Sequence, residues 1–394
     1  MNGTQYLGPT DPETGGFDFT ALRRFPDIEA ENLFAHDATD ELIHAEAADA
    51  LAQLAATGLD GSVAVVGDRY GALTLAAAAT HGLTGIRVHQ DPLSGELALA
   101  ANAERLGLAQ SFTSAPLTGE LFAGARVVLW QLPRGLDEIA EVAALIAAHA
   151  DPGVQVFAGG RVKHMTLAMN TVLGKYFQAL VPGRAWRKSR LLTVAGPRPD
   201  APASDFPHKE FNDSLGLWLC AHGATFAGTK LDIGTRFLLD FEPDMRRDAV
   251  TAIDLGCGNG TIAAALAAAR PDLHVSATDQ SAAAVASAAA TAEANGLAGR
   301  ITTVRDDALA GFEPGSAQLV VLNPPFHVGA TVHAGIALKL FDAAARVLAP
   351  GGELWTVYNR HLDYRAQLDA RVGPTTITGR NSKFTVAVSV RTRD

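Results

Sequence analysis

The sequence predicts an α/β protein with two tandem domains, each a mixed, mostly parallel sheet between helices, of which only the second keeps an intact ligand site. Three observations predict this fold class. Short apolar runs alternate with alanine-rich helical patterns, as in repeated strand–helix units. A glycine-rich turn at residues 256–260 joins one such run to a helix. An imperfect copy of this arrangement starts at residue 63, and self-similarity at a period near half the chain indicates duplication.

Length and composition restrict the class of protein. With 394 residues, 48% of them hydrophobic, the chain is long enough for two to three domains of ordinary size. No apolar run approaches the ~18 residues of a membrane span, and the polar N-terminus lacks the pattern of a signal peptide. The two cysteines, Cys220 and Cys257, argue against a disulfide scaffold or a cysteine-based zinc site. We therefore expect a cytoplasmic monomer with no metal and no membrane partner.

The charge of the chain is unevenly distributed. The formal net charge is −10, and the first 60 residues are strongly acidic. Residues 152–199 contain no acidic residue but contain Arg161, Lys163, Lys175, Arg184, Arg187, Lys188, Arg190 and Arg198. Such a basic tract in an acidic chain is typical of a local phosphate-binding surface, and the alternative is an ordinary solvated face. Arg161, Lys163, Arg187, Lys188 and Arg190 are our candidate contacts to nucleic-acid phosphates.

Composition shifts along the chain predict the domain boundaries. Residues 1–20 form a polar lead that we expect to be poorly ordered. Residues 21–195 form the degenerate domain, in which residues 22–26 are expected at a sheet edge and residues 37–56 in an amphipathic helix. Residues 196–225 form a proline-bearing joint, and residues 226–394 form the intact domain. A short hairpin and a helix start are expected over residues 226–238.

The first copy lacks the features that a ligand site needs. Its strand at residues 63–66 enters the turn at residues 67–71, where Arg69 replaces the middle glycine and Val65 replaces the acid before the turn. An arginine side chain at that glycine position would fill the space a ligand occupies. The residue that corresponds to Asp279 of the second copy is Gln90, which lacks the charge that strengthens a ribose hydrogen bond; Asp91 is the alternative. We expect this copy to be a scaffold or a platform for RNA.

The second copy has the features of an S-adenosylmethionine site. Glycines at positions 256, 258 and 260 allow positive φ angles and close ligand approach, and the following helix N-terminus adds N–H donors. Asp254 either anchors the turn or binds the methionyl ammonium. Asp279 ends the next apolar run, where a carboxylate can bind both ribose hydroxyls, and Gln280 follows it. The full set of predicted cofactor residues is Phe226, Asp254, Gly256, Cys257, Gly258, Asn259, Gly260, Asp279, Gln280, Asp307 and Asn323.

Two of these residues depend on where neighbouring segments run. A carboxylate after the fourth strand can accept a hydrogen bond from the adenine amine, and we favour Asp307 over Asp306 because it directly precedes Ala308. Phe226 begins a segment that could cover the cofactor, and the alternative is a core position.

The tetrapeptide Asn323-Pro324-Pro325-Phe326 ends a third apolar run and predicts an amine-methylating centre. The Asn323 side-chain carbonyl and the Pro324 main-chain carbonyl can hold both hydrogens of a planar exocyclic amine and direct its lone pair at the methyl group. The prolines fix that main-chain carbonyl, and Phe326 can stack on a flipped-out base. His327 is expected to contact the substrate rather than to act as a base.

Polar residues at two further strand ends are candidate substrate contacts. Arg360 and His361 follow the strand expected at residues 353–358, and Lys383 lies between the last two strands. In sheets of this type, strand ends face the ligand-binding rim, so these side chains could bind phosphate or guanine. An ordinary surface loop is the alternative for each.

These motifs resemble those of the bacterial rRNA guanine-N2 methyltransferases, which join a degenerate and an active Rossmann-like class I methyltransferase domain. The resemblance rests on residues 22–26, 231–237, 254–260, 323–327 and 359–364, and so covers nearly the whole chain. It implies cofactor roles for Gly256, Gly258, Asp279 and Asp307, and an amine-holding role for Asn323 and Pro324. The run at residues 360–364 and the N-terminal copy favour the branch that modifies large-subunit 23S rRNA.

The sequence therefore predicts S-adenosylmethionine-dependent methylation of a guanine N2 amine in 23S rRNA. Alternatives within enzymes are a 16S small-subunit rRNA methyltransferase, a methyltransferase for another RNA, and a protein-glutamine methyltransferase. An alternative of another class is a non-catalytic RNA-binding or ribosome assembly protein that keeps the fold.

Overall fold

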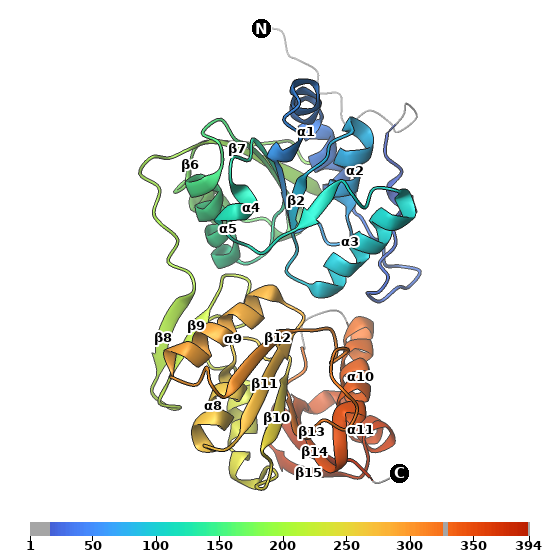
Figure 1. Cartoon of the computed structure of the whole chain (residues 1–394), viewed down its shortest axis with the longest axis vertical. Helices are drawn as coiled ribbons and strands as arrows, with labels where there is room; N and C mark the ends of the chain where they lie inside the picture. The colour runs from blue at the N-terminus through green and yellow to red at the C-terminus, as the bar shows by residue number, and fades with distance from the viewer. Residues whose placement is uncertain (1–15, 326–329, 393–394) are drawn as a thin grey trace. The chain divides into compact units, whose positions relative to one another are not determined.

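The chain forms two compact units, Met1–Asp205 and Phe206–Asp394. The computed structural model describes residues 16–325 and 330–392. Each unit is built on a seven-stranded, mostly parallel sheet between helices (Figure 1). The predicted fold class is confirmed.

The first sheet has the strand order β3-β2-β1-β4-β5-β7-β6, in which β7 is antiparallel to both of its neighbours. Its strands are β1 (Val63–Val66), β2 (Ile86–His89), β3 (Phe112–Ser114), β4 (Val127–Gln131), β5 (Gln155–Arg161), β6 (Phe177–Pro182) and β7 (Ser189–Pro197). Its helices are α1 (Ala38–Thr57), α2 (Ala72–His81), α3 (Leu93–Leu106), α4 (Gly119–Phe122), α5 (Leu136–His149) and α6 (Leu167–Leu173).

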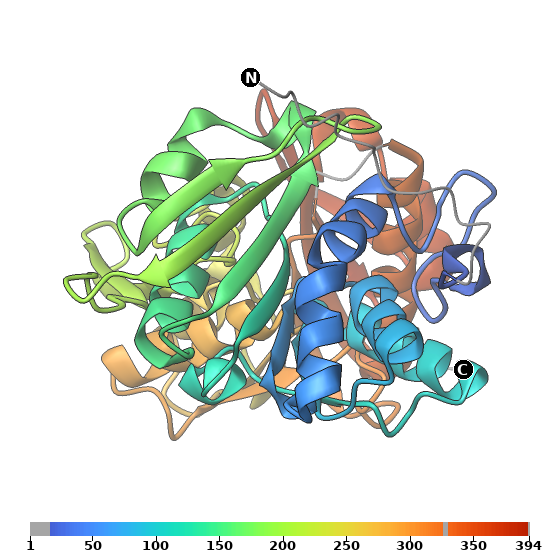
Figure 2. The same cartoon turned by 90° about the horizontal axis from the view of Figure 1, so that it is seen from above.

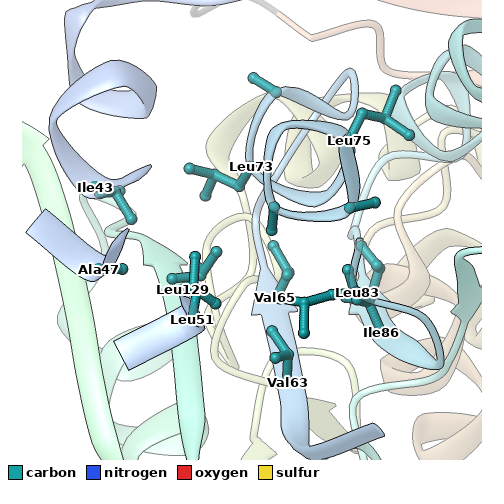
Figure 3. Close-up of a cluster of buried hydrophobic side chains, with 14 of the residues drawn as sticks. Ile43, Ala47, Leu51, Val63, Val65, Leu73, Leu75, Leu83, Ile86 and Leu129 are labelled. Atoms are coloured by element: carbon teal, nitrogen blue, oxygen red, sulfur yellow. The ribbon is translucent and has the colours of Figure 1, made fainter. Parts of the chain in front are cut away.

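Alternation along β1 explains how this sheet is covered. Val63 and Val65 belong to a hydrophobic cluster with α1, α2 and α3 (Figure 3). Ala64 and Val66 belong to a second cluster with α4, α5 and α6. Successive strand residues point to opposite faces, so a strand covered on both faces is apolar throughout. Figure 2 shows α1 and α2 side by side on one face of the sheet.

Two predicted elements at the start of this unit have different outcomes. The helix expected at residues 37–56 is α1, whose first turn is closed by a capping box between Asp37 and Asp40. Residues 22–26 do not form the expected edge strand. Leu22 is buried instead, and the N–H of Arg23 donates to Asn102 Oδ1 of α3 at 3.0 Å. The segment is therefore fixed by contacts with a helix and not by sheet pairing.

The second sheet repeats the order of the first as β12-β11-β10-β13-β14-β16-β15. Its strands are β10 (Thr251–Leu255), β11 (His274–Asp279), β12 (Ile301–Arg305), β13 (Ala317–Leu322), β14 (Leu348–Asn359), β15 (Thr375–Arg380) and β16 (Phe384–Val390). The helices of this unit are α7 (Ile233–Leu239), α8 (Thr261–Ala269), α9 (Ala282–Ala294), α10 (Ala330–Val347) and α11 (Arg365–Arg371). The identical order supports the predicted duplication.

A hairpin precedes this sheet in the segment expected to be a joint. It consists of β8 (His208–Asn212) and β9 (Leu217–Ala221). Polar side chains at α9 provide hydrogen-bond acceptors for the free edge of β9. The backbone N–H groups of Trp218, Cys220 and His222 donate to Asn295 Oδ1, Thr291 Oγ1 and Ser287 Oγ, respectively, at 2.8–2.9 Å. The hairpin expected at residues 226–238 does not form; that segment contains turns and α7.

Candidate active site in the second unit

The glycine turn between β10 and α8 has the backbone that the sequence predicts. Gly256, Gly258 and Gly260 have φ angles of 76°, 51° and 76°. A Cβ on Gly260 would lie 2.8 Å from Ala288 Cα, so this glycine lets α8 approach α9. A Cβ on Gly256 or Gly258 would meet no atom within 4 Å. These two glycines therefore face open space, as a ligand site requires.

Asp254 lies at the end of β10 and is fully buried. Its Oδ2 accepts from the N–H of Ala263 in α8 at 3.0 Å, which anchors the turn. Its Oδ1 is buried and has no partner in the described part of the chain. Burial raises the pKa of Asp254 to about 7. The residue thus has one oxygen that stabilises the turn and one that a cationic group could use.

Asp279 is the last residue of β11 and lies against the turn. Its Oδ2 accepts from the N–H of Gly258 at 3.1 Å, and its Oδ1 accepts from the N–H of Ser281 at 3.0 Å. Gln280, which follows it, is exposed. The structure therefore brings the predicted ribose carboxylate together with the glycine turn.

The side chains of the other two turn residues are buried. Asn259 is buried, accepts from Thr261 Oγ1 at 2.6 Å, and donates through Nδ2 to the carbonyl of Gly228 at 2.9 Å. Cys257 is buried in the core cluster, and burial raises its thiol pKa well above the ordinary value. Both side chains support the turn, which leaves their backbone atoms as the groups that a cofactor could contact.

The loop after β12 separates the two candidate adenine residues. Both oxygens of Asp306 accept backbone hydrogen bonds from its own loop, from Ala310 at 2.7 Å and Gly311 at 2.8 Å. Asp307 instead forms an ion pair with Lys339 of α10 at 2.6 Å. Asp306 closes its own turn, and Lys339 Nζ donates to both carboxylate oxygens of Asp307, so the role of Asp307 stays a prediction.

Asn323 follows β13 and is held at one end of its amide. Its Nδ2 donates to Asp232 Oδ2 at 3.0 Å and to Thr235 Oγ1 at 2.9 Å. Its Oδ1 is buried and has no partner among the described residues. Pro324 is buried and Pro325 is exposed. The predicted Phe326 and His327 lie outside the described residues.

A cleft of about 910 Å³ lies next to Asn323. Asp232, which accepts a hydrogen bond from Asn323, is one of the residues that line this cleft. Its basic side chains are the predicted Arg360, His361 and Lys383. The complete lining is Phe226, Asp232, Ile233, Asn359, Arg360, His361, Ser382, Lys383 and Phe384. The two segments that carry the basic residues are joined by a backbone hydrogen bond from Arg360 N to Lys383 O at 2.8 Å. Phe226 is 59% exposed and lies in this cleft, so it is not a core residue.

The corresponding turn in the first unit has the same backbone but is filled. Gly67, Arg69 and Gly71 have φ angles of 74°, 57° and 95°. Sheet register places Gln131 at the position of Asn323, because Trp130 pairs with Val66 as Leu322 pairs with Leu255. A Cβ on Gly67 would lie 3.1 Å from the carbonyl oxygen of Gln131. The space that is open beside Gly256 is therefore occupied here.

The structure divides the basic tract between the two opposite edges of the first sheet that are formed by strand ends. One edge lies where β5 ends and β7 begins, and the other lies where β6 begins and β7 ends. Arg161, at the end of β5, pairs with Ser189, and the N–H of Val162 donates to the carbonyl of Lys188 at 2.9 Å. Lys163, Arg187, Lys188 and Arg190 are exposed near this edge. Arg187 also stacks on Trp186 at 4.5 Å and pairs with Glu41 at 3.1 Å. Lys175 and Arg198 lie at the opposite edge, where β6 begins and β7 ends.

Three residues that the structure places at the basic tract or beside Asn323, namely Arg134, Asp232 and Thr235, are not predicted from the sequence. Arg134 donates to His164 Nε2 at 2.9 Å, and desolvation followed by the charges of Arg134, Lys163 and Arg161 lowers the pKa of His164. Arg134 follows the end of β4, and a basic residue just after a strand is a signal from which the sequence could have predicted it. Asp232 and Thr235 of the Asn323 network are also absent from the predicted set, although an acid directly before a helix is a capping signal.

Neither a metal site nor a membrane span occurs among the described residues. No group of three or more His, Cys, Asp or Glu side chains is placed to hold a metal ion there. Over the same residues, no helix combines the length and the hydropathy of a membrane span.

Comparisons with known proteins follow the division into two units. The model of the RLMG N-terminal domain matches residues 13–198, and the methyltransferase small domain matches residues 216–388. The ribosomal RNA large subunit methyltransferase G of Streptomyces coelicolor is 35% identical over 382 residues, covering 94% of this chain and 97% of that protein. The protein of the same name from Pseudomonas aeruginosa is 35% identical over 369 residues, with 93% and 96% covered.

A solved structure has a similar fold. The T. thermophilus 16S rRNA N2 methyltransferase in complex with AdoMet and guanosine matches with a TM-score of 0.69 at 20% identity, covering 87% of this chain and 92% of that one. At this identity the match supports the fold alone.

Proposed function

We propose a reaction for this chain from the premise that it belongs to the ribosomal RNA large subunit methyltransferase G family. The chain is an S-adenosylmethionine-dependent methyltransferase that acts on large-subunit (23S) rRNA. The methyl group is transferred to the exocyclic N2 amine of a guanine. The observation that carries this assignment to a site is the amide of Asn323, whose nitrogen is held by the protein and whose buried oxygen has no partner among the described residues.

The residues around the glycine turn fit S-adenosylmethionine. Gly256 and Gly258 border open space, Asp279 presents a carboxylate at the turn, and the buried Asp254 Oδ1 lacks a protein partner in the described part of the chain. We assign Asp279 to the ribose, Asp307 to the adenine amine and the turn N–H groups to the carboxylate, with Asp254 serving the ammonium. When bound, this cofactor supplies an electrophilic methyl group on a sulfonium.

Asn323 and Pro324 orient the methyl acceptor. The lone pair of a guanine N2 is delocalised into the ring, which makes the free amine a poor nucleophile. Two carbonyl acceptors, Asn323 Oδ1 and the main chain of Pro324, hold the two N2 hydrogens and localise the lone pair. N2 forms the bond to the methyl carbon while the sulfur–carbon bond breaks, and the nitrogen then loses one proton to water. Phe326 is assigned to stacking on the flipped-out base and His327 to a substrate contact.

Two positive surfaces are assigned to the RNA. In the second unit, Arg360, His361 and Lys383 line the cleft that Asp232 connects to Asn323. In the first unit, Arg161, Lys163, Arg187, Lys188 and Arg190 gather near one edge of the sheet. Clustered cations provide the sequence-independent part of RNA affinity. The substrate makes the cytoplasm the compartment of the reaction, and we propose that the chain acts as a monomer.

Transfer of labelled methyl from S-adenosylmethionine to separated 23S and 16S rRNA tests this function. The RNA should come from cells that lack the gene, be supplied both free and in subunits, and be analysed as nucleosides. We expect N2-methylguanosine in 23S rRNA only, and its loss by at least about 100-fold with Asn323→Ala, the size typical of removing a transition-state acceptor or donor. Label confined to 16S rRNA would contradict the assigned substrate. Cofactor binding without transfer to any RNA would contradict the reaction.

A further inference from the structure

We infer that Asp232, together with Thr235, is a positioning residue that fixes the orientation of the Asn323 amide. Asp232 Oδ2 and Thr235 Oγ1 lie 3.0 and 2.9 Å from Asn323 Nδ2. This inference rests on the proposed function, since it concerns the acceptor oxygen that would bind the guanine amine. It assigns a role in the reaction to residues that lie 91 and 88 positions away in the sequence.

The chemistry of the pair allows one orientation of the amide. A carboxylate can only accept hydrogen bonds, and an amide offers two N–H donors at one end and an acceptor at the other. Rotating the amide by 180° would place Asn323 Oδ1 against Asp232 Oδ2, two acceptors in contact. It would also place the donor group where the guanine N2 hydrogens must bind. The carboxylate thus keeps Oδ1, which is buried and unpartnered among the described residues, available as an acceptor.

Asp232 is itself held in place by the start of α7. It is the N-cap of this helix, and its Oδ2 accepts from the N–H groups of Gly234 at 2.8 Å and Thr235 at 3.0 Å. Gly234 is crowded by the same network, since a Cβ there would lie 3.0 Å from Asp232 Oδ2 and 3.6 Å from Asn323 Nδ2. Three donors converge on one oxygen, so the carboxylate has little freedom to release the amide.

The first unit contains a related pair that provides a matched control. Gln131 occupies the position of Asn323, and its Nε2 donates to Oδ1 of the buried Asp40. Asp40 belongs to the capping box of α1, as Asp232 caps α7. In the first unit the space at the turn is filled, so Asp40→Asn removes a similar carboxylate without touching the reaction.

The test compares Asp232→Asn, Thr235→Val, Thr235→Ser and Asp40→Asn in the full chain. We expect Thr235→Val to lower the single-turnover methyl transfer rate about 3- to 30-fold, and Asp232→Asn about 10- to 100-fold, in the range of effects from a misplaced catalytic group. Thr235→Ser keeps the hydroxyl and should restore the rate. The dissociation constant of S-adenosylmethionine and the KM for rRNA should change less than about twofold. Asp40→Asn should alter stability alone.

A second readout does not depend on activity. Selective 15N-asparagine labelling shows the side-chain NH2 signals of Asn323, identified by their loss in Asn323→Ala. In the unmodified protein these hydrogens should exchange slowly with water, and both Asp232→Asn and Thr235→Val should shift the signals and speed exchange. Unchanged signals and unchanged transfer rates in both variants would overturn the inference. If the unmodified protein transfers no methyl to rRNA, the proposed function fails, and the NMR result still decides whether Asp232 fixes the amide.

Discussion

Asn323 and Asp254 of the second unit each have one buried oxygen atom that lacks a protein partner among the described residues, as do the hydroxyl groups of Thr356 and Tyr358. A buried polar atom without a hydrogen bond destabilises the folded protein by about 1–3 kcal/mol, so such atoms usually indicate a missing ligand or water. In the first two of these residues the other polar atom is firmly held, by Asp232 and by Ala263 respectively. The two oxygens are therefore placed before a ligand arrives.

The protonation of Asp254 predicts how stability depends on pH. Burial raises its pKa from 3.8 to about 7, so the folded state retains a proton that the unfolded state loses. Stability must then fall as pH rises from about 4 to about 7, by at most ~1.4 kcal/mol per pH unit for this group. Asp254→Asn is neutral throughout and should lack this dependence. The buried Asp40, with a pKa of about 7, contributes equally to both proteins and cancels in the comparison.

Urea unfolding of the two proteins at about pH 5, 6 and 7, without cofactor, measures this difference. The free energy of unfolding of Asp254→Asn, relative to that of the unmodified protein, should increase with each rise in pH. Parallel pH profiles would show that Asp254 is already ionised in the folded protein.

At the scale of elements, the strand–turn–helix unit of residues 251–269 combines two uses of glycine. Gly260 serves packing, since α9 lies where its side chain would be, and Gly256 serves the ligand, since a Cβ there would meet no atom within 4 Å. Both have φ angles of 76°, so an alanine at either position costs about 1–2 kcal/mol in backbone strain.

The pair Gly256→Ala and Gly260→Ala separates these uses. Gly260→Ala should reduce stability by an additional ~1–3 kcal/mol, because its Cβ would collide with Ala288 and force α8 from α9. Gly256→Ala should fold with the smaller destabilisation but bind S-adenosylmethionine at least about 10-fold more weakly, a cost of ~1.4 kcal/mol. Thermal unfolding and calorimetric titration give both quantities. Equal destabilisation of the two variants, with unchanged cofactor affinity in Gly256→Ala, would contradict this division.

The same element explains what the sequence could predict. The strand, the glycine turn and the helix can be predicted because the pattern for each lies within the contiguous segment 251–269. The link between Asp232 and Asn323 joins segments 91 residues apart and depends on how α7 packs beside the sheet. The sequence predicts a hairpin at residues 226–238, but the hairpin lies at residues 208–221, where its edge is satisfied by a polar stripe on α9. The contact of Asp232 with Asn323 and the contact of β9 with α9 each join two distant segments, so the residues of one segment alone do not predict either contact.

At the scale of the whole chain, two units share one strand order but differ in whether the turn is open. Arg69 and Gln90 predict this difference from the sequence. In the structure, Asp68 also holds the start of α2 by accepting from the N–H of Leu73 at 2.7 Å, and the carbonyl of Gln131 lies against Gly67. The closure observed in the structure therefore comes from the carbonyl of Gln131, whereas Arg69, the residue that predicts it from the sequence, is exposed.

This closure predicts the outcome of restoring the glycine. Arg69→Gly should raise stability by about 1 kcal/mol, because a non-glycine residue with a φ of 57° is strained. It should not create a second cofactor site, since Gln131 still fills the space. Calorimetric titration should give one S-adenosylmethionine per chain for the unmodified protein and for Arg69→Gly. The variant Asp279→Ala, in which the second unit is disabled and the first is unmodified, should bind none. A stoichiometry of two for Arg69→Gly would contradict this account.

The division of the basic tract between two edges of the first sheet predicts which cations contact RNA. The tract is continuous in the sequence, but β6 and β7 run antiparallel, so Lys175 and Arg198 lie at the edge opposite to Lys188 and Arg190. The triple variant Lys163→Ala, Lys188→Ala, Arg190→Ala removes three exposed charges from one edge. The triple variant Arg126→Ala, Lys175→Ala, Arg198→Ala removes the same charge from the other edge, where β4 begins.

The salt dependence of rRNA binding distinguishes the two edges. Removing one phosphate contact reduces the slope of log K against log salt by about 0.7–0.9, so the slope of the first variant should be smaller by about 2 to 3. Its affinity should fall about uniformly across RNA sequences, while the second variant keeps both slope and affinity. Equal effects of the two variants would mean that only net charge matters. That result would leave Arg360, His361 and Lys383 in the cleft of the second unit as the assigned RNA contacts.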